Sequence, residues 1–452
     1  MNWIKQIGEF LLSWPLNLYV IGISVICTLV FGFVQFRYFG QAWKSLFSPA
    51  KPSGAKKAKA DMTPLQAFIN TLNTNLGNGS VAGMATAIYS GGPGSAIWVV
   101  IIGVLLMAVR FAEVYLSVYY SEKSTTKKSE LGGPMLYLRE VIGGRYLSVA
   151  YAFFCVLFGL LMGTALQTNS IRISVQTTWG IAPIITAVIL TLFMIYVVCG
   201  GAKRVVALSD KIVPVKVVVF FASTFIVLAY NYQSLLPSLK LMFSSAFSPL
   251  ALAGGLIGFT VQQAMRYGIQ RSIFATESGL GTAAILYSST GSKEPVRAGL
   301  VSMLSTFIST IVCFLIAWCI VASGVWNSGL TSTALTIASY NTAFGWLAGW
   351  VGSFLSISFG VGVLVTFVYV TRQAWLSLTG GRYENVFYAI VCAVAFAGAL
   401  LDATTIFSIG DYILAGMLLI NLFGIVYLIP VIKKGLASFR AGKNKKIKKK
   451  SK

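Results

Sequence analysis

The stretch from Asn73 to Gly94, NTNLGNGSVAGMATAIYSGGPG, places polar and glycine residues inside a long apolar segment. Asn78 lies between Gly77 and Gly79. A helix in lipid tolerates such an interruption only where it lines a cavity or is buried in protein. Half-helix N-termini can then bind an anionic group, and unwound carbonyls can bind a cation. A packing seam is the alternative, because small residues let membrane helices approach closely, but a seam does not need the asparagines.

A second polar interruption lies in the apolar segment 252–286. Gln262 falls in the middle of this segment, and the small residues of Glu277–Gly281 end the polar run. In the span order given below, the segment crosses the membrane in the direction opposite to the first interrupted segment. Two interrupted helices five spans apart, with opposite directions, are typical of a five-plus-five inverted repeat. The sequence therefore predicts that helices 1 and 6 of such a repeat are discontinuous.

Charged residues also fall inside the apolar segments. Arg110 and Glu113 are three residues apart and share a helix face, so we expect a mutual ion pair near the cytoplasmic end. Arg266 and Arg271 are costly at mid-depth, although nearer the cytoplasm their side chains could snorkel. For these arginines we expect a structural or gating ion pair with Glu277 or Glu113 rather than direct substrate contact.

The composition is that of a polytopic membrane protein. Hydrophobic residues make up 56% of the 452 residues and charged residues 10%, and the mean hydropathy is +0.79. The chain has no histidine, which excludes Ser-His-Asp catalysis, histidine zinc sites and the usual proton shuttle at neutral pH. Its six cysteines lie in apolar segments without metal-type clustering, so we expect no bound cofactor.

The charge distribution predicts the topology. We expect 11 transmembrane helices, one extra helix followed by ten, at roughly 15–37, 64–90, 94–120, 146–171, 181–200, 212–232, 252–286, 296–323, 345–379, 384–404 and 410–432. Of the 35 Lys and Arg residues, 28 then fall in alternate connections and 3 on the opposite side. The positive-inside rule places the N-terminus outside and the C-terminus in the cytoplasm. The other four basic residues lie within predicted spans: Arg110, Lys216, Arg266 and Arg271.

The fold class is therefore an all-α polytopic membrane protein with four regions. Residues 1–62 form the extra N-terminal helix and a basic cytoplasmic linker. Residues 63–235 and 236–432 form the first and second inverted repeats. Residues 433–452 form a basic cytoplasmic tail, which we expect to lie on anionic lipid headgroups rather than to bind nucleic acid.

The chain resembles the alanine or glycine:cation symporter family. The resemblance extends from Pro15 to Pro430 and rests on several stretches: Gly77–Gly94 with its GNGSVAG…ATAI…GGPG layout, Phe111–Glu113, Gly132–Met135, Gln167–Ser170, Gly200–Arg204, Arg271–Gly281 and Pro295–Leu300. It implies a leucine-transporter-type fold with one additional helix. It also implies import of small amino acids, namely glycine and either enantiomer of alanine, usually with sodium.

The resemblance implies a substrate site at the first interruption. The backbone around Gly77 and Gly79 should meet the substrate carboxylate, and Gln167 should contact the pocket. Apolar bulk in the interrupted and facing helices should limit the substrate to about the size of alanine or serine. The expected substrate-binding residues are Gly77, Asn78, Gly79, Ser80, Gln167, Phe259, Gln262, Met265 and Phe367.

Sodium is the coupling ion that we expect from the resemblance. Its expected ligands are Leu76, Gly79, Ser358 and Thr366. Gly362 and Val363, however, stand where the family pattern leads us to expect the paired threonines of a second sodium site. Proton coupling is the competitor and would need Glu113 or Glu277, each of which has an arginine nearby in the sequence.

The sequence thus favours a secondary active importer of small neutral amino acids in the bacterial inner membrane. The substrates expected are alanine and glycine, with D-alanine and serine next. A membrane-embedded enzyme is disfavoured, because the chain has no histidine, no paired mid-membrane carboxylates and no nucleophile elbow. Proton coupling, and a degenerate transporter that acts as a sensor, stay open as alternatives.

Overall fold

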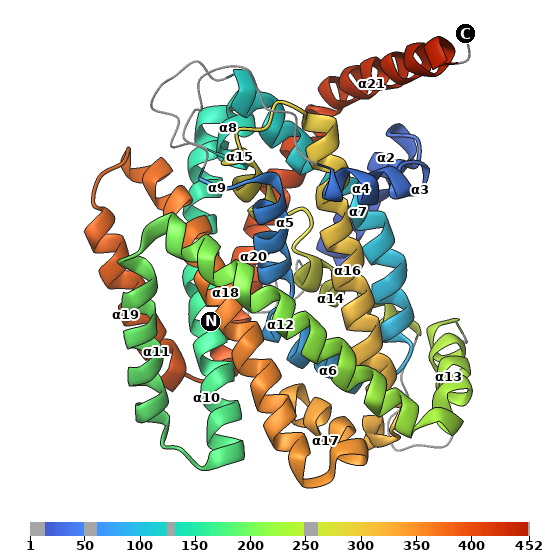
Figure 1. Cartoon of the computed structure of the whole chain (residues 1–452), viewed down its shortest axis with the longest axis vertical. Coiled ribbons are helices and arrows are strands. Elements are labelled where there is room, and N and C mark those ends of the chain that lie inside the picture. The colour runs from blue at the N-terminus through green and yellow to red at the C-terminus, as the bar shows by residue number, and fades with distance from the viewer. Residues whose placement is uncertain (1–13, 49–60, 124–131, 248–260, 451–452) are drawn as a thin grey trace.

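The computed structural model describes residues 14–48, 61–123, 132–247 and 261–450, and these contain helices and no strand (Figure 1). Before the core lie α2 (Trp14–Val30), α3 (Val34–Arg37) and α4 (Phe39–Phe47). Helix α2 packs on the later helices α7 and α20, and α4 packs on α16. The predicted extra helix therefore packs on the side of the core.

The first half of the core begins with a helix that is fixed at its start by a capping box. Thr63 Oγ1 accepts a hydrogen bond from Gln66 N, Gln66 Oε1 accepts one from Thr63 N, and Pro64 occupies the first helical position. The helices of this half are α5 (Pro64–Asn75), α6 (Asn78–Gly91), α7 (Ser95–Lys123), α8 (Pro134–Tyr137), α9 (Gly144–Phe158), a π-helical segment (Gly159–Ala165), α10 (Leu166–Trp179), α11 (Pro183–Val198) and α12 (Gly201–Tyr230).

The second half continues with α13 (Leu235–Phe247), α14 (Val261–Thr276), α15 (Thr282–Ser288), α16 (Pro295–Ala322), α17 (Ser332–Phe344), α18 (Ala348–Thr379), α19 (Glu384–Leu400), α20 (Ala403–Tyr427) and α21 (Ile429–Lys450). Short 3-10 turns lie at Leu138–Glu140, Tyr232–Ser234, Val325–Asn327 and Gly345–Leu347. Helix α7 packs along α16 and α14, and α18 packs against α10 and α12.

Both predicted helix interruptions are present. Leu76–Gly77 separates α5 from α6, as expected. The second break is at Glu277–Gly281, between α14 and α15, and Gln262 lies in the first turn of α14, far from it. Positive φ angles at Glu277, Gly279 and Gly281 stop the helix there, and glycine adopts this conformation without a steric penalty. The inverted-repeat relation between the halves stays a prediction.

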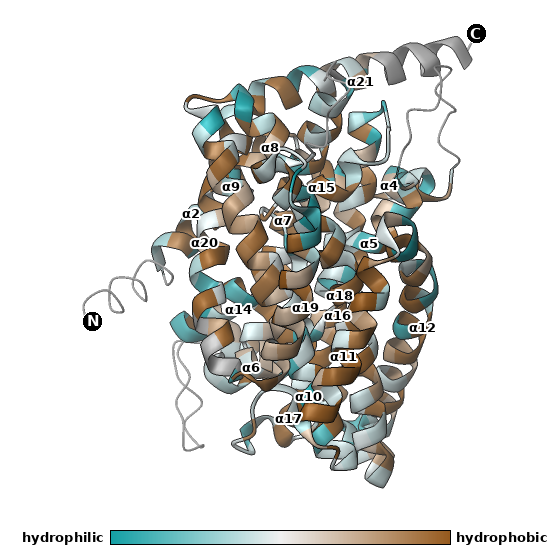
Figure 2. Cartoon of the chain, turned by 90° about the vertical axis from the view of Figure 1, so that its left-hand side faces the viewer, coloured by the Kyte–Doolittle hydropathy of each residue, from teal (hydrophilic) through white to brown (hydrophobic). Residues whose placement is uncertain are grey.

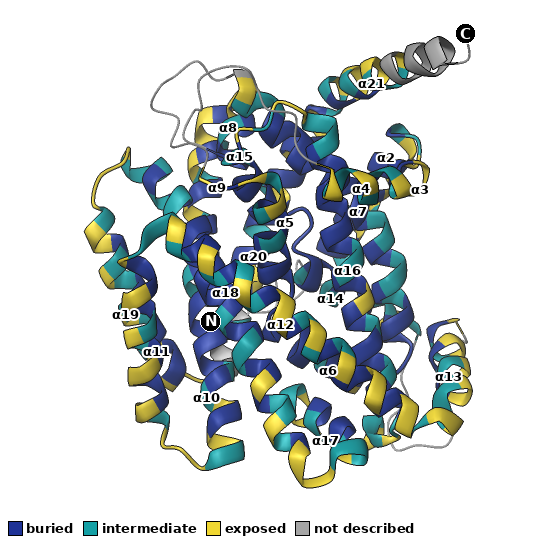
Figure 3. Ribbon diagram, in the orientation of Figure 1, coloured by how far each residue is buried: buried dark blue, intermediate teal, exposed yellow. Residues whose placement is uncertain are grey.

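The outer surface suits a lipid bilayer. Among the described residues, six helices are long and apolar enough to span a membrane, and three shorter apolar helices accompany them. Hydrophobic residues dominate the middle of the bundle (Figure 2), and the outer helices α11 and α19 alternate between buried and exposed positions while the central helices are buried (Figure 3). Apolar side chains exposed on α11 include Ile185, Ile189 and Leu192. This arrangement is that of a multi-pass membrane protein; the count of 11 spans and the orientation of the termini stay predictions.

Candidate functional site

The break between α5 and α6 borders a small buried cavity. The cavity has a volume of about 20 Å³ and is lined by Thr74, Asn75, Gly77, Gly79, Ser80, Phe158, Met162, Gln167, Phe274, Glu277, Val363 and Phe367. That volume is roughly the space of one water molecule. An amino acid can therefore enter only when the lining side chains move apart.

Gln167 connects the cavity to two backbone groups. Its Oε1 accepts a hydrogen bond from Asn78 N, in the first turn of α6, at 3.3 Å. Its Nε2 donates to Met162 O, within the π-helical segment, at 3.1 Å. A π-helical segment changes the backbone pairing locally and is frequent at functional sites. The Gln167 amide thus lies at the N-terminus of α6, where the partial positive charge of the helix favours an anion.

A hydrogen-bond donor and a carboxylate line the same cavity. Asn75 Nδ2 is buried and has no hydrogen-bond partner within the described residues. The Glu277 carboxylate, also buried, accepts a hydrogen bond from Thr282 Oγ1 at 2.7 Å. Donors at the α6 end and a carboxylate at the α14 end could receive the carboxylate and the ammonium group of a zwitterion.

Apolar side chains close the rest of the cavity. A Cβ atom on Gly77 would lie 2.6 Å from Val363 Cγ2, and one on Gly79 would lie 2.1 Å from Phe274 Cε1. A Cβ atom on Gly163, in the π-helical segment, would lie 2.4 Å from Phe367 Cγ. The glycines therefore let aromatic and branched side chains approach the broken backbone, which leaves little width for a ligand side chain.

The buried charges of α7 hold the second break in place. Arg110 pairs with Glu113 at 2.7 Å, and both side chains are fully buried, so the predicted mutual pair is confirmed. Glu113 Oε2 also accepts hydrogen bonds from Gly279 N at 3.0 Å and Gly281 N at 3.1 Å, while Arg110 donates to Thr276 O. The pair thus satisfies backbone groups that the break leaves without helical partners.

The expected pairing of the other arginines with Glu277 or Glu113 is wrong. The Arg271 guanidinium lies 5.8 Å from the ring centroid of Phe274, packs against Gly83 of α6 and lines a separate cavity of about 70 Å³. Arg266 lies 5.8 Å from the ring centroid of Tyr267. Both arginines lie on α14 before the break.

Five predicted substrate-binding residues line the cavity: Gly77, Gly79, Ser80, Gln167 and Phe367. Asn78 takes part through its backbone nitrogen. The structure does not bring Gln262 or Met265 to the cavity: Gln262 is exposed and Met265 is half-buried. Phe259 lies outside the described residues. Sequence reasoning did not assign Thr74, Asn75, Phe158, Met162, Phe274 and Val363 to the substrate site. Of these residues, Asn75 could have been found, because it lies within the polar stretch that predicted the first break. Sequence reasoning gave Glu277 a structural or gating role and, under the alternative of proton coupling, that of a proton carrier.

Three of the four predicted sodium ligands have a hydrogen bond within the protein. Leu76 O accepts a hydrogen bond from the side-chain nitrogen of Lys216 at 3.0 Å. Thr366 Oγ1 donates to Asn70 Oδ1 at 3.1 Å, and Ser358 Oγ donates to Leu355 O at 3.0 Å. Gly79 instead lies against Phe274. A sodium ion needs several oxygens to replace its hydration shell, and the Leu76 carbonyl, which already binds the Lys216 nitrogen, does not fit as one of them.

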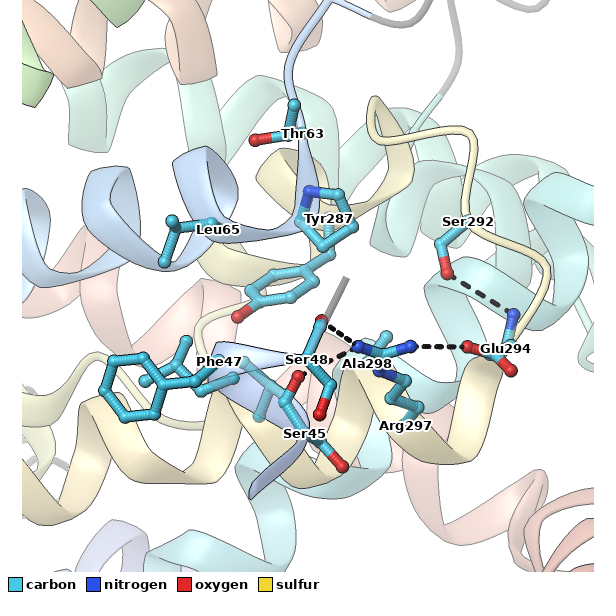
Figure 4. A pocket seen from close by; sticks show the side chains of 13 residues that line it. Ser45, Phe47, Ser48, Thr63, Leu65, Tyr287, Ser292, Glu294, Arg297 and Ala298 are labelled. Atoms are coloured by element: carbon cyan, nitrogen blue, oxygen red, sulfur yellow. Dashed lines mark hydrogen bonds and ion pairs between the residues drawn. The ribbon is translucent and has the colours of Figure 1, made fainter. Parts of the chain in front are cut away.

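A larger cavity, of about 430 Å³, lies elsewhere, between α4, the start of α5, α15 and α16 (Figure 4). Arg297 crosses its wall, pairing with Glu294 at 3.1 Å and donating to the backbone oxygens of Ser45 and Ser48. Residues of the two helix breaks do not line it. We therefore place the candidate binding site at the smaller, buried cavity.

The whole chain matches a known family. The profile of the sodium:alanine symporter family matches residues 1–452. An uncharacterized transporter of Haemophilus influenzae is 32% identical over 95% of this chain and 94% of its own. The sodium/alanine symporter AgcS of Methanococcus maripaludis is 29% identical over 95% of both chains.

A solved structure shares the fold. The substrate-bound, outward-open state of a Na⁺-coupled sialic acid symporter superposes with a TM-score of 0.54 at 14% identity, over 87% of this chain and 81% of its own. The predicted resemblance to a transporter family is thus confirmed, and the chain belongs to the sodium:alanine symporter family.

Proposed function

We propose that the chain is a secondary active transporter that imports small neutral amino acids across the bacterial inner membrane. Alanine and glycine are the first candidates, with D-alanine and serine next. The observation that carries this proposal is the cavity at the α5–α6 break, which is lined both by the Gln167 amide at the α6 N-terminus and by the Glu277 carboxylate. A zwitterion has the two charges that such a site can receive.

Substrate size is the second element of the proposal. Phe274 lies against Gly79 and Val363 against Gly77, and all four residues line the cavity together with Phe367. A methyl or hydroxymethyl group needs little displacement of these side chains. A leucine side chain needs a much larger one, so the site should reject it sterically.

The orientation and the coupling ion complete the proposal. The positive-inside distribution supports an external N-terminus and a cytoplasmic C-terminus, with the basic tail near anionic headgroups. The family description and the printed name of AgcS favour sodium coupling, whereas the donor set at the α5–α6 break disfavours it. Proton coupling is the alternative for the driving ion.

Uptake of labelled alanine and glycine into proteoliposomes tests the transport function. We expect accumulation in wild-type vesicles and its loss in Gly79→Leu, which fills the cavity from a position where even a Cβ atom would overlap Phe274. Gly22→Leu is the matched control, since no atom lies within 4 Å of the Cβ position there. Equal uptake by all three proteins, or none by the wild type under any imposed gradient, would refute the proposal.

A further inference from the structure

We infer that the side-chain ammonium of Lys216 takes the place of a coupling sodium ion at the α5–α6 break, so that transport by this chain does not require sodium. The inference rests on the proposed transport function and identifies the cationic group that binds the backbone at the break. It follows from three contacts of Lys216, which lies in α12 and is fully buried.

The first contact is with the backbone of the break itself. Lys216 Nζ donates a hydrogen bond to Leu76 O at 3.0 Å. Leu76 follows the last residue of α5, and the interruption frees carbonyls at this end from helical pairing. Such unwound carbonyls are the groups that bind a cation in broken transporter helices. Here the cation bound to this carbonyl is covalently attached to the protein.

The second contact explains the missing hydroxyls of α18. A Cβ atom on Gly362 would lie 2.8 Å from Lys216 Nζ and 2.5 Å from Asn73 Oδ1. A threonine at this position would therefore overlap the lysine nitrogen. Val363, the next residue, contributes a methyl group against Gly77 and no oxygen. The lack of hydroxyls and the presence of the lysine are thus two parts of one arrangement.

The third contact stabilises the charge in an apolar surrounding. Lys216 Nζ lies 5.4 Å from the ring centroid of Phe359, on the same helix as Gly362. The ring face attracts a cation at this distance. In the described part of the chain, no carboxylate forms an ion pair with Lys216. The ammonium therefore connects α12, the break and α18, as a bound metal ion between these helices would.

This arrangement has a functional consequence. A sodium ion leaves its site during each transport cycle, whereas the lysine cannot leave. The lysine nitrogen therefore stays bound at the break whether or not sodium is present. Removing the lysine and supplying a hydroxyl should convert the position into one that accepts a free cation.

The test compares thermal stability and uptake in sodium chloride, potassium chloride and choline chloride at equal ionic strength. We expect the wild-type melting temperature (Tm) to be the same in all three salts, and alanine uptake without sodium to stay within about two-fold of uptake with it. Lys216→Ala combined with Val363→Thr should gain a sodium-specific rise in Tm of about 5 °C or more, because a ligand that binds only the folded state stabilises it. Lys211→Met is the control, because Lys211 lies on the same helix and is exposed.

Two outcomes overturn the inference. One is a wild-type protein whose uptake is lost when choline replaces sodium. The other is a sodium-specific rise in wild-type Tm that persists in Lys216→Met. If no protein takes up alanine under any gradient, the proposed transport function fails, while the comparison of Tm between salts still decides the inference.

Discussion

The side-chain oxygen of Gln167 accepts a hydrogen bond from the backbone nitrogen of Asn78, 89 residues earlier in the chain. The contact joins the N-terminus of α6 to the helix that contains the π-helical segment. Gln167→Ala should weaken alanine binding by about ten-fold or more, since hydrogen bonds to charged groups contribute about 1.5–3 kcal/mol. Binding measured by calorimetry on purified protein checks this.

Gln176→Ala is the control for that change, because Gln176 lies on the same helix, is exposed and accepts a hydrogen bond from Arg172. It should leave affinity unchanged. Unchanged affinity in Gln167→Ala together with a lowered Tm would instead assign Gln167 to helix packing.

Substrate size should depend on Phe367. In wild-type protein we expect alanine and glycine to displace labelled alanine and leucine to fail. Phe367→Ala removes a ring from the cavity wall and should admit valine or leucine as competitors, although one apolar contact discriminates by only about 1–3 kcal/mol. Phe354→Ala, at an exposed position of the same helix, should leave the selectivity unchanged. Equal competition by leucine in the wild type would refute the steric argument.

Gly77 and Val363 should be coupled. The backbone of Gly77 is extended, with φ −113° and ψ −178°, so any residue can adopt it and the effect of a side chain is steric. Gly77→Ala places a methyl group against Val363 and should lower both alanine affinity and Tm. Val363→Ala should restore most of the loss, with a coupling energy of about 0.5–3 kcal/mol in a double-mutant cycle of Tm and affinity. Purely additive effects would show that the two residues do not meet.

Two ion pairs with the same spacing should differ in their contribution to stability. Glu113→Gln leaves Arg110 charged, buried and without its partner, so we expect a loss of about 3–5 kcal/mol in the free energy of unfolding. Glu294→Gln breaks the exposed pair with Arg297 and should cost at most about 1 kcal/mol. Denaturant titration in detergent compares them. Similar losses in both variants would contradict the assignment of Glu113 as the support of the second break.

The first break and part of the site could be predicted from the sequence. Glycine and asparagine at 73–80 conflict with an uninterrupted membrane helix, and this local signal predicted a break within 76–80, where the structure has it at Leu76–Gly77. The Arg110–Glu113 pair followed from spacing on one helix face. Local chemistry was sufficient for both features because neither depends on how distant helices are arranged.

The rest depends on tertiary packing. Gln262 was assigned to the site because it lies mid-way along an apolar segment, but the second break begins at Glu277, about four helical turns later. Phe274 thus reaches the cavity, whereas Gln262 does not. Lys216 had no acidic neighbour in its span, and an ionisable residue in such a place is a functional candidate by default. The sequence did not reveal that its nitrogen meets Leu76.

The π-helical segment Gly159–Ala165 determines where the continuous helix from α9 to α10 can lose a residue without changing the direction of its side chains. A π segment holds more residues per turn than the α-helix on either side of it. Deleting one residue inside the segment can convert it to α-helix, and the side chains of Phe158 and Gln167 still point to the same side of the helix. A deletion elsewhere in α9 or α10 rotates one half by about 100° relative to the other. Relatives that differ by one residue in this helix should therefore carry the gap within the π-helical segment.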